Sequence, residues 1–152
     1  MRTIYFLAFI AISLTACQLK NEPERVITQK QTMPPHADRK ITVEKLQVNV
    51  PPAEGGITIA ELYAHKDTYA GKTVKIKGQV TKFNAKIMKK NWIHIQDGTD
   101  FSGKFDLAAN SDITVSVGET ITLEGKVLLN KDFGSGYFYE VLLEDARLIQ
   151  MQ

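Results

Sequence analysis

The chain has 152 residues, of which 43% are hydrophobic and 24% are charged, and its formal net charge is +2. This composition is typical of a soluble globular protein, and the length suits one domain of about 90 to 100 residues plus a tail. Cys17 is the single cysteine, which excludes a disulfide within one molecule.

An apolar run at the N-terminus, residues 4–14, follows Arg2. It is too short to span a bilayer as a stable helix, but its length is typical of a cleaved export signal. The run closes on Leu-Thr-Ala-Cys, which predicts a lipoprotein signal peptide over 1–16 and lipidation of Cys17. Diacylglycerol and an acyl chain on this residue give a stable membrane anchor. The alternative is a secretory signal with an incidental cysteine.

The segment after the cysteine is polar and rich in proline, which predicts a flexible tether over 17–56. Gln18 is not the aspartate that retains lipoproteins in an inner membrane, so we expect the periplasmic face of an outer membrane in a cell with two membranes. Residues 41–48 could form a short extended arm. Glycines near residue 55 break the chain, and the folded domain is expected over 57–152.

A capping box opens the predicted domain. Thr58 lies three residues before Glu61, and this spacing predicts a helix over 58–69 with Thr58 at its N-cap. Gly71 is a natural stop after this helix. The segment is short, so its stability is expected to come from packing.

Two copies of one strand pattern follow, 47 residues apart, over 71–80 and 118–127. Each copy reads Gly, any residue, Thr, then alternating apolar positions, Gly, any residue, Val. The alternation predicts half-buried strands. The central glycines, Gly78 and Gly125, replace an inward side chain, which is typical of a bend or bulge in a strand that curls between the sheets of a barrel.

Three further strands are expected over 91–96, 104–109 and 137–143. Together with the two repeats they predict an all-β fold, the five-stranded Greek-key barrel called the OB-fold, with the helix at 58–69 as a short N-terminal cap. The segment 110–119 has little room for the helix that usually joins strands three and four. Phe105 and Leu107 are expected to point inward. The side chains expected on one face of the last strand are Tyr137, Tyr139, Val141 and Leu143.

Three strings, over 71–80, 87–99 and 130–137, resemble a family of small exported bacterial OB-fold proteins that are often lipoproteins. Some members are described beside nitrite-reductase and cytochrome maturation systems, and their domain is labelled nucleic-acid-binding by analogy of fold. The resemblance covers 57–149 and implies the barrel. It implies no catalytic residues, and fold alone does not imply function.

OB-folds bind oligomers on the outer face of strands two and three and in two flanking loops. We expect those loops at 83–90 and 129–136. Lysines beside aromatic rings suit an anionic polymer, because charge adds affinity and the rings offer stacking surfaces. The candidate ligand-binding residues are Lys86, Lys89, Lys90, Trp92, His94, Lys131 and Phe133.

Trp92, the lysines and Phe133 each have a structural alternative. Trp92 could pack beneath the helix or the arm, because tryptophan is largely buried on average. The lysines could simply solvate a loop or the outer side of a strand, and Phe133 could anchor its loop to the barrel. The segment 66–90 holds eight lysines and one acid, whereas 97–152 holds ten acids and four basic residues, so one end of the domain could present a positive face.

Metal chemistry has weak signals. The three histidines, His36, His65 and His94, show no ligand spacing, although Met33 with His36, or Met88 near His94, could suit copper. We therefore predict no metal site and no cofactor. Lipidation of the cysteine would also remove the thiol as a metal ligand or nucleophile.

Enzyme motifs are missing from the sequence. There is no Gly-x-Ser-x-Gly elbow, and Gly71-Lys72-Thr73 lacks the first glycine of a phosphate loop, because position 66 is lysine. No histidine follows Leu143 to ligate haem. The chain is therefore not expected to be an enzyme.

These observations predict a membrane-anchored, non-enzymatic binding domain. Its expected ligand is a polyanionic glycan, a peptidoglycan fragment or a protein partner, and nucleic acid enters by analogy of fold only. The alternative is an accessory factor for assembly of periplasmic metalloproteins, of the copper or cytochrome type. A spacer without a ligand is the third hypothesis.

Overall fold

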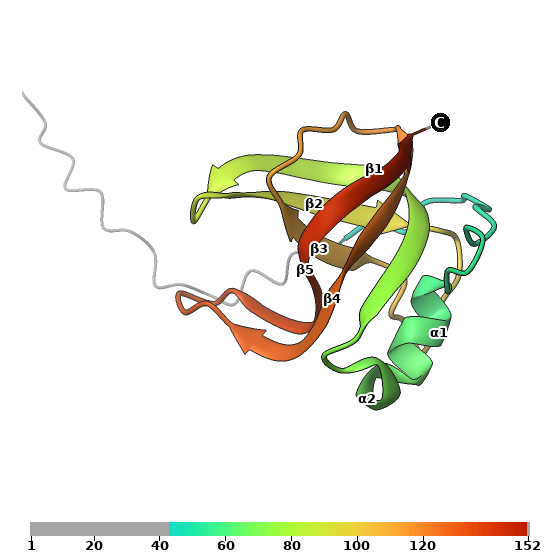
Figure 1. The fold of residues 1–152 in the computed structure, drawn as a ribbon, viewed down its shortest axis with the longest axis horizontal. Helices are drawn as coiled ribbons and strands as arrows, with labels where there is room; N and C mark the ends of the chain where they lie inside the picture. The colour runs from blue at the N-terminus through green and yellow to red at the C-terminus, as the bar shows by residue number, and fades with distance from the viewer. Residues whose placement is uncertain (1–42, 152) are drawn as a thin grey trace, which may run out of the picture. The chain divides into compact units, whose positions relative to one another are not determined.

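The computed structural model describes residues 43–151, and Figure 1 shows them as one β-sheet with two short helices. The strands follow one another in the order β1-β2-β3-β5-β4, and the sheet closes on itself. The predicted all-β class is confirmed. The elements are α1 (Ile59–Ala64), α2 (Lys66–Tyr69), β1 (Thr73–Ile87), β2 (Lys90–Gln96), β3 (Leu107–Ser111), β4 (Thr120–Asp132) and β5 (Phe138–Met151).

The two repeats lie side by side as antiparallel neighbours in β1 and β4. Ile76 pairs with Leu123, and these two residues hold equivalent positions in the repeat pattern. The pairing is therefore two-fold symmetric about them, since each copy meets the other in the same register. Both side chains are fully buried in the core. The prediction of two glycine-containing strands is confirmed, and the structure pairs them with each other.

The two central glycines let strands approach each other closely. A Cβ at Gly125 would lie 2.8 Å from Cγ of Leu143, and this glycine sits at a register shift between β4 and β5. A Cβ at Gly78 would lie 3.0 Å from the carbonyl oxygen of Gln96. Here β1 leaves β4 and takes β2 as its partner, without a register shift at the glycine itself. A bulge therefore occurs at one glycine and a change of partner at the other.

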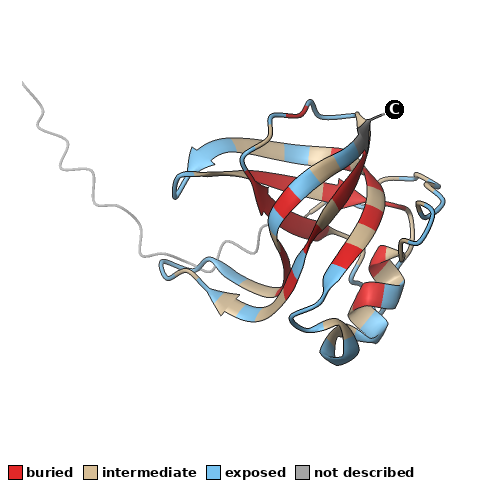
Figure 2. Ribbon diagram, viewed as in Figure 1, coloured by how far each residue is buried: buried red, intermediate tan, exposed pale blue. Residues whose placement is uncertain are grey.

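Buried residues alternate with more exposed ones along the strands, and the buried ones form the core. Figure 2 shows buried residues concentrated on the strands and on one side of α1, and exposed residues towards the hairpin ends. In the first half of β1, every second residue from Val74 to Val80 is buried. The core combines these side chains with Ile59 and Leu62 from α1, so the helix closes one side of the barrel.

The segment predicted as one helix over 58–69 forms two helices that meet at His65. Thr58 is the N-cap, and its side chain accepts a hydrogen bond from the backbone of Glu61, as the capping box predicts. Two residues after β2 complete the cap. Asp97 accepts a hydrogen bond from the backbone N–H of Ile59, and Thr99 accepts one from the next residue.

The third strand is shorter than predicted. β3 begins at Leu107, and Phe105 lies outside it, half-buried, with Lys45 over its ring. The expectation that Phe105 points inward from a strand over 104–109 is therefore wrong. β3 meets β5 as a parallel pair with only two registered residue pairs, Ala108 with Leu142 and Ala109 with Leu143.

The prediction of loops over 83–90 and 129–136 is wrong, because most of these residues belong to strands. β1 and β2 form a hairpin whose turn is Met88 and Lys89, while Ile87 pairs with Lys90. β4 and β5 pair out to Asp132, so the turn there covers 133–137 only. Both hairpin tips project from the side of the barrel opposite the helices (Figure 1).

The arm predicted over 41–48 is attached to the end of β2, where the structure describes it. Gln96 accepts a hydrogen bond from the backbone of Leu46 and donates one to Glu44, and the Val50 N–H bonds to the Asp97 carbonyl. Gly98 lets the arm pass, because a Cβ there would lie 1.9 Å from the Val48 oxygen. Among residues 43–151, no helix has both the length and the apolarity that crossing a membrane requires.

Candidate ligand-binding groove

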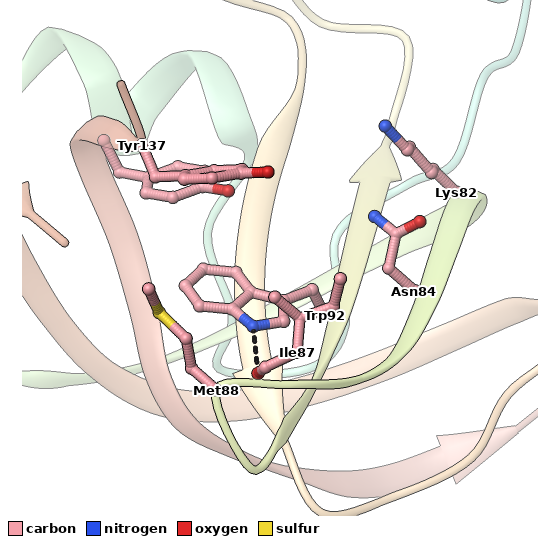
Figure 3. A pocket seen from close by; sticks show the side chains of 7 residues that line it. Lys82, Asn84, Ile87, Met88, Trp92 and Tyr137 are labelled. Carbon is pink, nitrogen blue, oxygen red and sulfur yellow. Dashed lines mark hydrogen bonds between the residues drawn. The ribbon is translucent and has the colours of Figure 1, made fainter. Parts of the chain in front are cut away.

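A groove of about 210 Å³ lies between the β1–β2 hairpin and the start of β5. Figure 3 shows Tyr137 on one side of it, Lys82 and Asn84 on another, and Ile87 and Met88 below. Its lining side chains combine aromatic, aliphatic, amide and ammonium groups, and none of them is a carboxylate. They are Lys82, Asn84, Ile87, Met88, Trp92, Tyr137 and Tyr139.

The tip of the β1–β2 hairpin presents apolar side chains to solvent. Ile87 is 43% exposed and Met88 53%. Met88 and Lys89 have φ angles of +53° and +66°, a left-handed conformation that costs non-glycine residues energy. A two-residue hairpin turn of this kind requires a positive φ at both positions and usually uses asparagine and glycine, so Met88 and Lys89 form the turn here at some cost in energy.

Two hydrogen bonds hold this tip in place. The indole N–H of Trp92 donates to the backbone oxygen of Ile87 over 2.9 Å, as the dashed line in Figure 3 marks. The side chain of Asn91 accepts a hydrogen bond from the backbone of Lys86. The exposed apolar residues are therefore presented on an ordered turn.

Trp92 belongs to an aromatic cluster under the β4–β5 hairpin. Its ring stacks on Tyr139 at 5.2 Å between centroids, and the Phe133 ring meets it edge-on at 5.1 Å. Only 6% of Trp92 is exposed, so it is neither an open stacking platform nor packed beneath the helix or the arm. Phe133 anchors its turn to the barrel, with Lys131 over its outer side at 5.5 Å.

Four polar side chains in the groove lining make no hydrogen bond within the described part of the chain. They are the ammonium of Lys82, the amide of Asn84 and the hydroxyls of Tyr137 and Tyr139. Burial raises the pKa of Tyr139, with further contributions from neighbouring Tyr137 and Asp106. A few convergent polar groups in a largely apolar depression are characteristic of a binding site.

The three lysines predicted for the first loop differ in their surroundings. Lys86 and Lys89 are exposed near the hairpin tip and have no ion pair among the described residues. Lys90 instead contacts Asp112 at 2.9 Å and Asp145 at 3.1 Å. Hydrogen bonds to these two carboxylates raise the pKa of Lys90. This lysine ties β2 to the segments after β3 and within β5, and its charge is already matched.

His94 faces a carboxylate rather than the groove. Its Nδ1 lies 2.6 Å from Oδ2 of Asp106, and both side chains are largely buried. Thr81 and Gln96 also donate hydrogen bonds to the other oxygen of Asp106. The sequence offered no signal for Asp106, since it lies 12 residues from His94 in a segment without periodicity.

A second charged cluster lies beside this pair. Glu140 accepts hydrogen bonds from Lys104 and Lys66, which hold the pKa of its carboxyl below the usual range. Tyr63 donates a hydrogen bond to the backbone oxygen of Asp106, and burial raises the pKa of Tyr63. These groups satisfy one another, so they connect α1 and α2 to the sheet.

The proposed metal ligands are not brought together within residues 43–151, where no group of three or more His, Cys, Asp or Glu side chains could hold a metal ion. His65 is exposed at the C-cap of α1, and Met88 lies at the hairpin tip. Cys17, Met33 and His36 lie outside the described residues.

The groove residues that the sequence analysis did not select come mostly from the two hairpins. They are Lys82, Asn84, Ile87, Met88, Tyr137 and Tyr139. Lys82 and Asn84 lie on the same face of β1, opposite His94 and Trp92 in register. An extended hairpin over 81–96 would have placed them there, whereas a loop would not.

Comparison of the chain with protein families, with curated proteins and with solved structures found no match. Inferences about function therefore depend on the residues and their geometry.

Proposed function

We propose that this chain is a lipoprotein of the cell envelope whose barrel binds an anionic, oligomeric ligand without catalysing a reaction. The signal peptide over 1–16 and the lipidated Cys17 lie outside the described residues, so the sequence motif supports them. They would place the domain at a membrane, most simply the periplasmic face of an outer membrane.

The barrel supports an OB-fold, Greek-key assignment. Five strands close in the order β1-β2-β3-β5-β4, and two hairpins flank the outer face of β2 and β3. OB-folds bind oligonucleotides and oligosaccharides in this region. The β4–β5 hairpin covers much of that face here, because Trp92, Ala108 and Leu142 are buried beneath it. The groove beside the covered face is the part that remains open.

The observation that carries the proposal is the combination of exposed apolar side chains at the hairpin tips with unmatched cations along the β1–β2 hairpin. Met88 and Tyr137 are 53% and 48% exposed, while Lys82, Lys86 and Lys89 have no ion pair among the described residues. Exposed apolar groups rimmed by charge are typical of interaction sites. The charges favour an anion, and the spacing of the lysines along one hairpin favours an extended one.

The proposal is tested with the chain from residue 18 onward, which contains every described residue. We expect it to be retained on columns of at least one anionic polymer among heparin, a muropeptide mixture and single-stranded DNA. Lys86→Glu with Lys89→Glu should abolish most of this retention, because each reversal replaces an attraction with a repulsion. Retention of the native chain should fall as salt rises, since exposed charges are screened.

A matched control carries Lys72→Glu and Lys126→Glu, which change the net charge equally at exposed positions away from both hairpin tips. This control should keep most of the retention. Equal losses in the two variants, or no retention of the native chain on any of the three columns, would reject the proposed site.

The lipid anchor has its own test in the full-length chain. Labelled palmitate should be incorporated into the native protein and not into Cys17→Ser, and the variant should leave the membrane fraction. Palmitate incorporation that survives this substitution would overturn the anchor. No observation on the described residues favours the alternative role in metalloprotein assembly.

A further inference from the structure

The size of the groove indicates what part of a polymer it holds. Sites for drug-sized ligands measure about 300 to 1,000 Å³, whereas this groove measures about 210 Å³. One ring unit fits such a volume, and the rest of an oligomer would run along the hairpin past Lys86 and Lys89. The groove is therefore a subsite within a longer contact.

The lining has an apolar side and a polar side. Tyr137, Ile87 and Met88 offer an aromatic face and aliphatic groups, while Lys82 and Asn84 lie across the groove from the tyrosine (Figure 3). A pyranose ring has the same division, since its axial C–H groups form an apolar face and its hydroxyls form a polar edge. The amide of Asn84 both donates and accepts, as neighbouring hydroxyls require.

The charge in the groove specifies an acidic unit. Lys82 contributes an ammonium without an ion pair among residues 43–151, and no carboxylate lines the groove. Among the acids of the neighbouring segments, Asp106 is engaged with His94, Glu140 with two lysines, and Asp132 accepts a hydrogen bond from the backbone of Gly134. A carboxylate on the ligand would supply the missing partner as a charge-assisted hydrogen bond.

A nucleobase fits these features less well. Stacking of successive bases needs open aromatic faces, and Trp92 is covered by Tyr139 and Phe133. Only Tyr137 offers an exposed ring in the lining, and single-sided contact of this kind suits a sugar.

We infer that the groove binds one acidic pyranose residue of a glycan, with its apolar face on Tyr137, its hydroxyls on Asn84 and its carboxylate on Lys82. This inference rests on the proposed function, because it specifies which anion the same site prefers. The glycan would be an oligomer that carries a carboxylate on a sugar ring or on its substituent.

The test measures the dissociation constants of four probes for the chain from residue 18 onward by titration calorimetry. The probes are tetragalacturonate, its methyl ester, a muramic acid-containing tetrasaccharide, and an eight-residue oligothymidylate. At least one acidic glycan should bind about tenfold more tightly than the neutral ester, as one charge-assisted hydrogen bond provides. It should also bind more tightly than the DNA.

The variants assign the effect to the groove. Lys82→Met should remove the preference for the acid over its ester, and Asn84→Ala should weaken binding of both the acid and the ester. Lys126→Met, at an exposed site outside the groove lining, should change neither the preference for the acid nor the two dissociation constants.

Two outcomes overturn the inference while the proposed function stands. They are tighter binding of the DNA than of either acidic glycan, and a preference for the acid that survives Lys82→Met. Absence of binding by all four probes would overturn the inference, whereas the proposed anionic ligand would be overturned only by loss of retention on all three columns.

Discussion

Polar side chains are hydrogen-bonded on one side of the barrel and, within the described residues, without partners on the other. Beside α1, Asp97 accepts three hydrogen bonds, one from Ile59 and two from Thr99. Between the hairpin tips, Lys82 and Asn84 find no partner among the described residues. Satisfied, buried groups contribute stability, whereas unsatisfied groups at the surface remain available to a ligand. Stability and binding should therefore depend on different residues.

The largest effect should come from the paired repeats. Leu123→Ala removes a fully buried side chain at the centre of the β1–β4 pair, and we expect a loss of about 2 to 5 kcal/mol in the free energy of unfolding. Urea denaturation followed by tryptophan fluorescence measures it. Val117→Ala, at a position that is 64% exposed, should stay within about 0.5 kcal/mol. Similar losses in both variants would break the contrast between core and surface.

Removal of the Asp97 carboxylate should have the next largest effect. Asp97→Ala leaves the backbone N–H of Ile59 without its acceptor at a buried position, which costs about 1 to 3 kcal/mol. The same urea titration serves, and ligand retention of the folded protein should not change. Asp67→Ala, an exposed carboxylate in α2, is the matched control. Reduced retention in Asp97→Ala under folding conditions would show that the two sides are coupled.

The barrel side could be predicted from the sequence because its signals are local. The repeat pattern, the alternation in 74–80 and the Thr58–Glu61 capping box each reflect burial or hydrogen bonding within a few residues. All three are present in the structure. The OB-fold name itself stays a prediction.

The groove side could not be predicted in the same way, because its strands are not alternately buried. The second half of β1 is mostly exposed and half-buried, so no period of two marks it as a strand. Met88 and Lys89 form the turn without glycine or asparagine, so the usual hairpin signal is missing. The partners of Trp92 come from a hairpin about 40 residues away, and no local pattern encodes that contact.

A substitution in the groove should weaken binding and leave stability nearly unchanged, which is the opposite of the result expected for the two barrel substitutions. Tyr137→Ala should change stability by no more than about 0.5 kcal/mol, because the side chain is half exposed. It should raise the dissociation constant of the bound anion about tenfold, the effect of losing one stacking contact. Phe138→Ala is the control, since this neighbour is 58% exposed and outside the groove lining. Equal weakening in both variants would show that exposed aromatic area matters and the groove does not.

The smallest effect concerns pH. Lys104 and Lys66 lower the pKa of Glu140 from its ordinary value of 4.5. The stability that the two ion pairs of Glu140 contribute is therefore fully present above pH 4.5 and is lost as pH falls through the lower pKa of the folded state. The partly exposed carboxylate limits the effect to less than about 1 kcal/mol. Urea titrations at pH 6 and pH 3 should show a smaller drop for Glu140→Gln than for the native chain. Identical drops would remove Glu140 from the pH response.

The short contact between β3 and β5 has a consequence for how the molecule opens. These strands register only Ala108 with Leu142 and Ala109 with Leu143, as a parallel pair, whereas β1 and β4 register every residue from Thr73 to Gln79 as an antiparallel pair. Parallel pairing is slightly less stable per residue, and a seam with few paired residues opens at a lower cost in free energy. We expect this seam to open first. Backbone amides beside it should then exchange with deuterium sooner than those between Ile76 and Leu123.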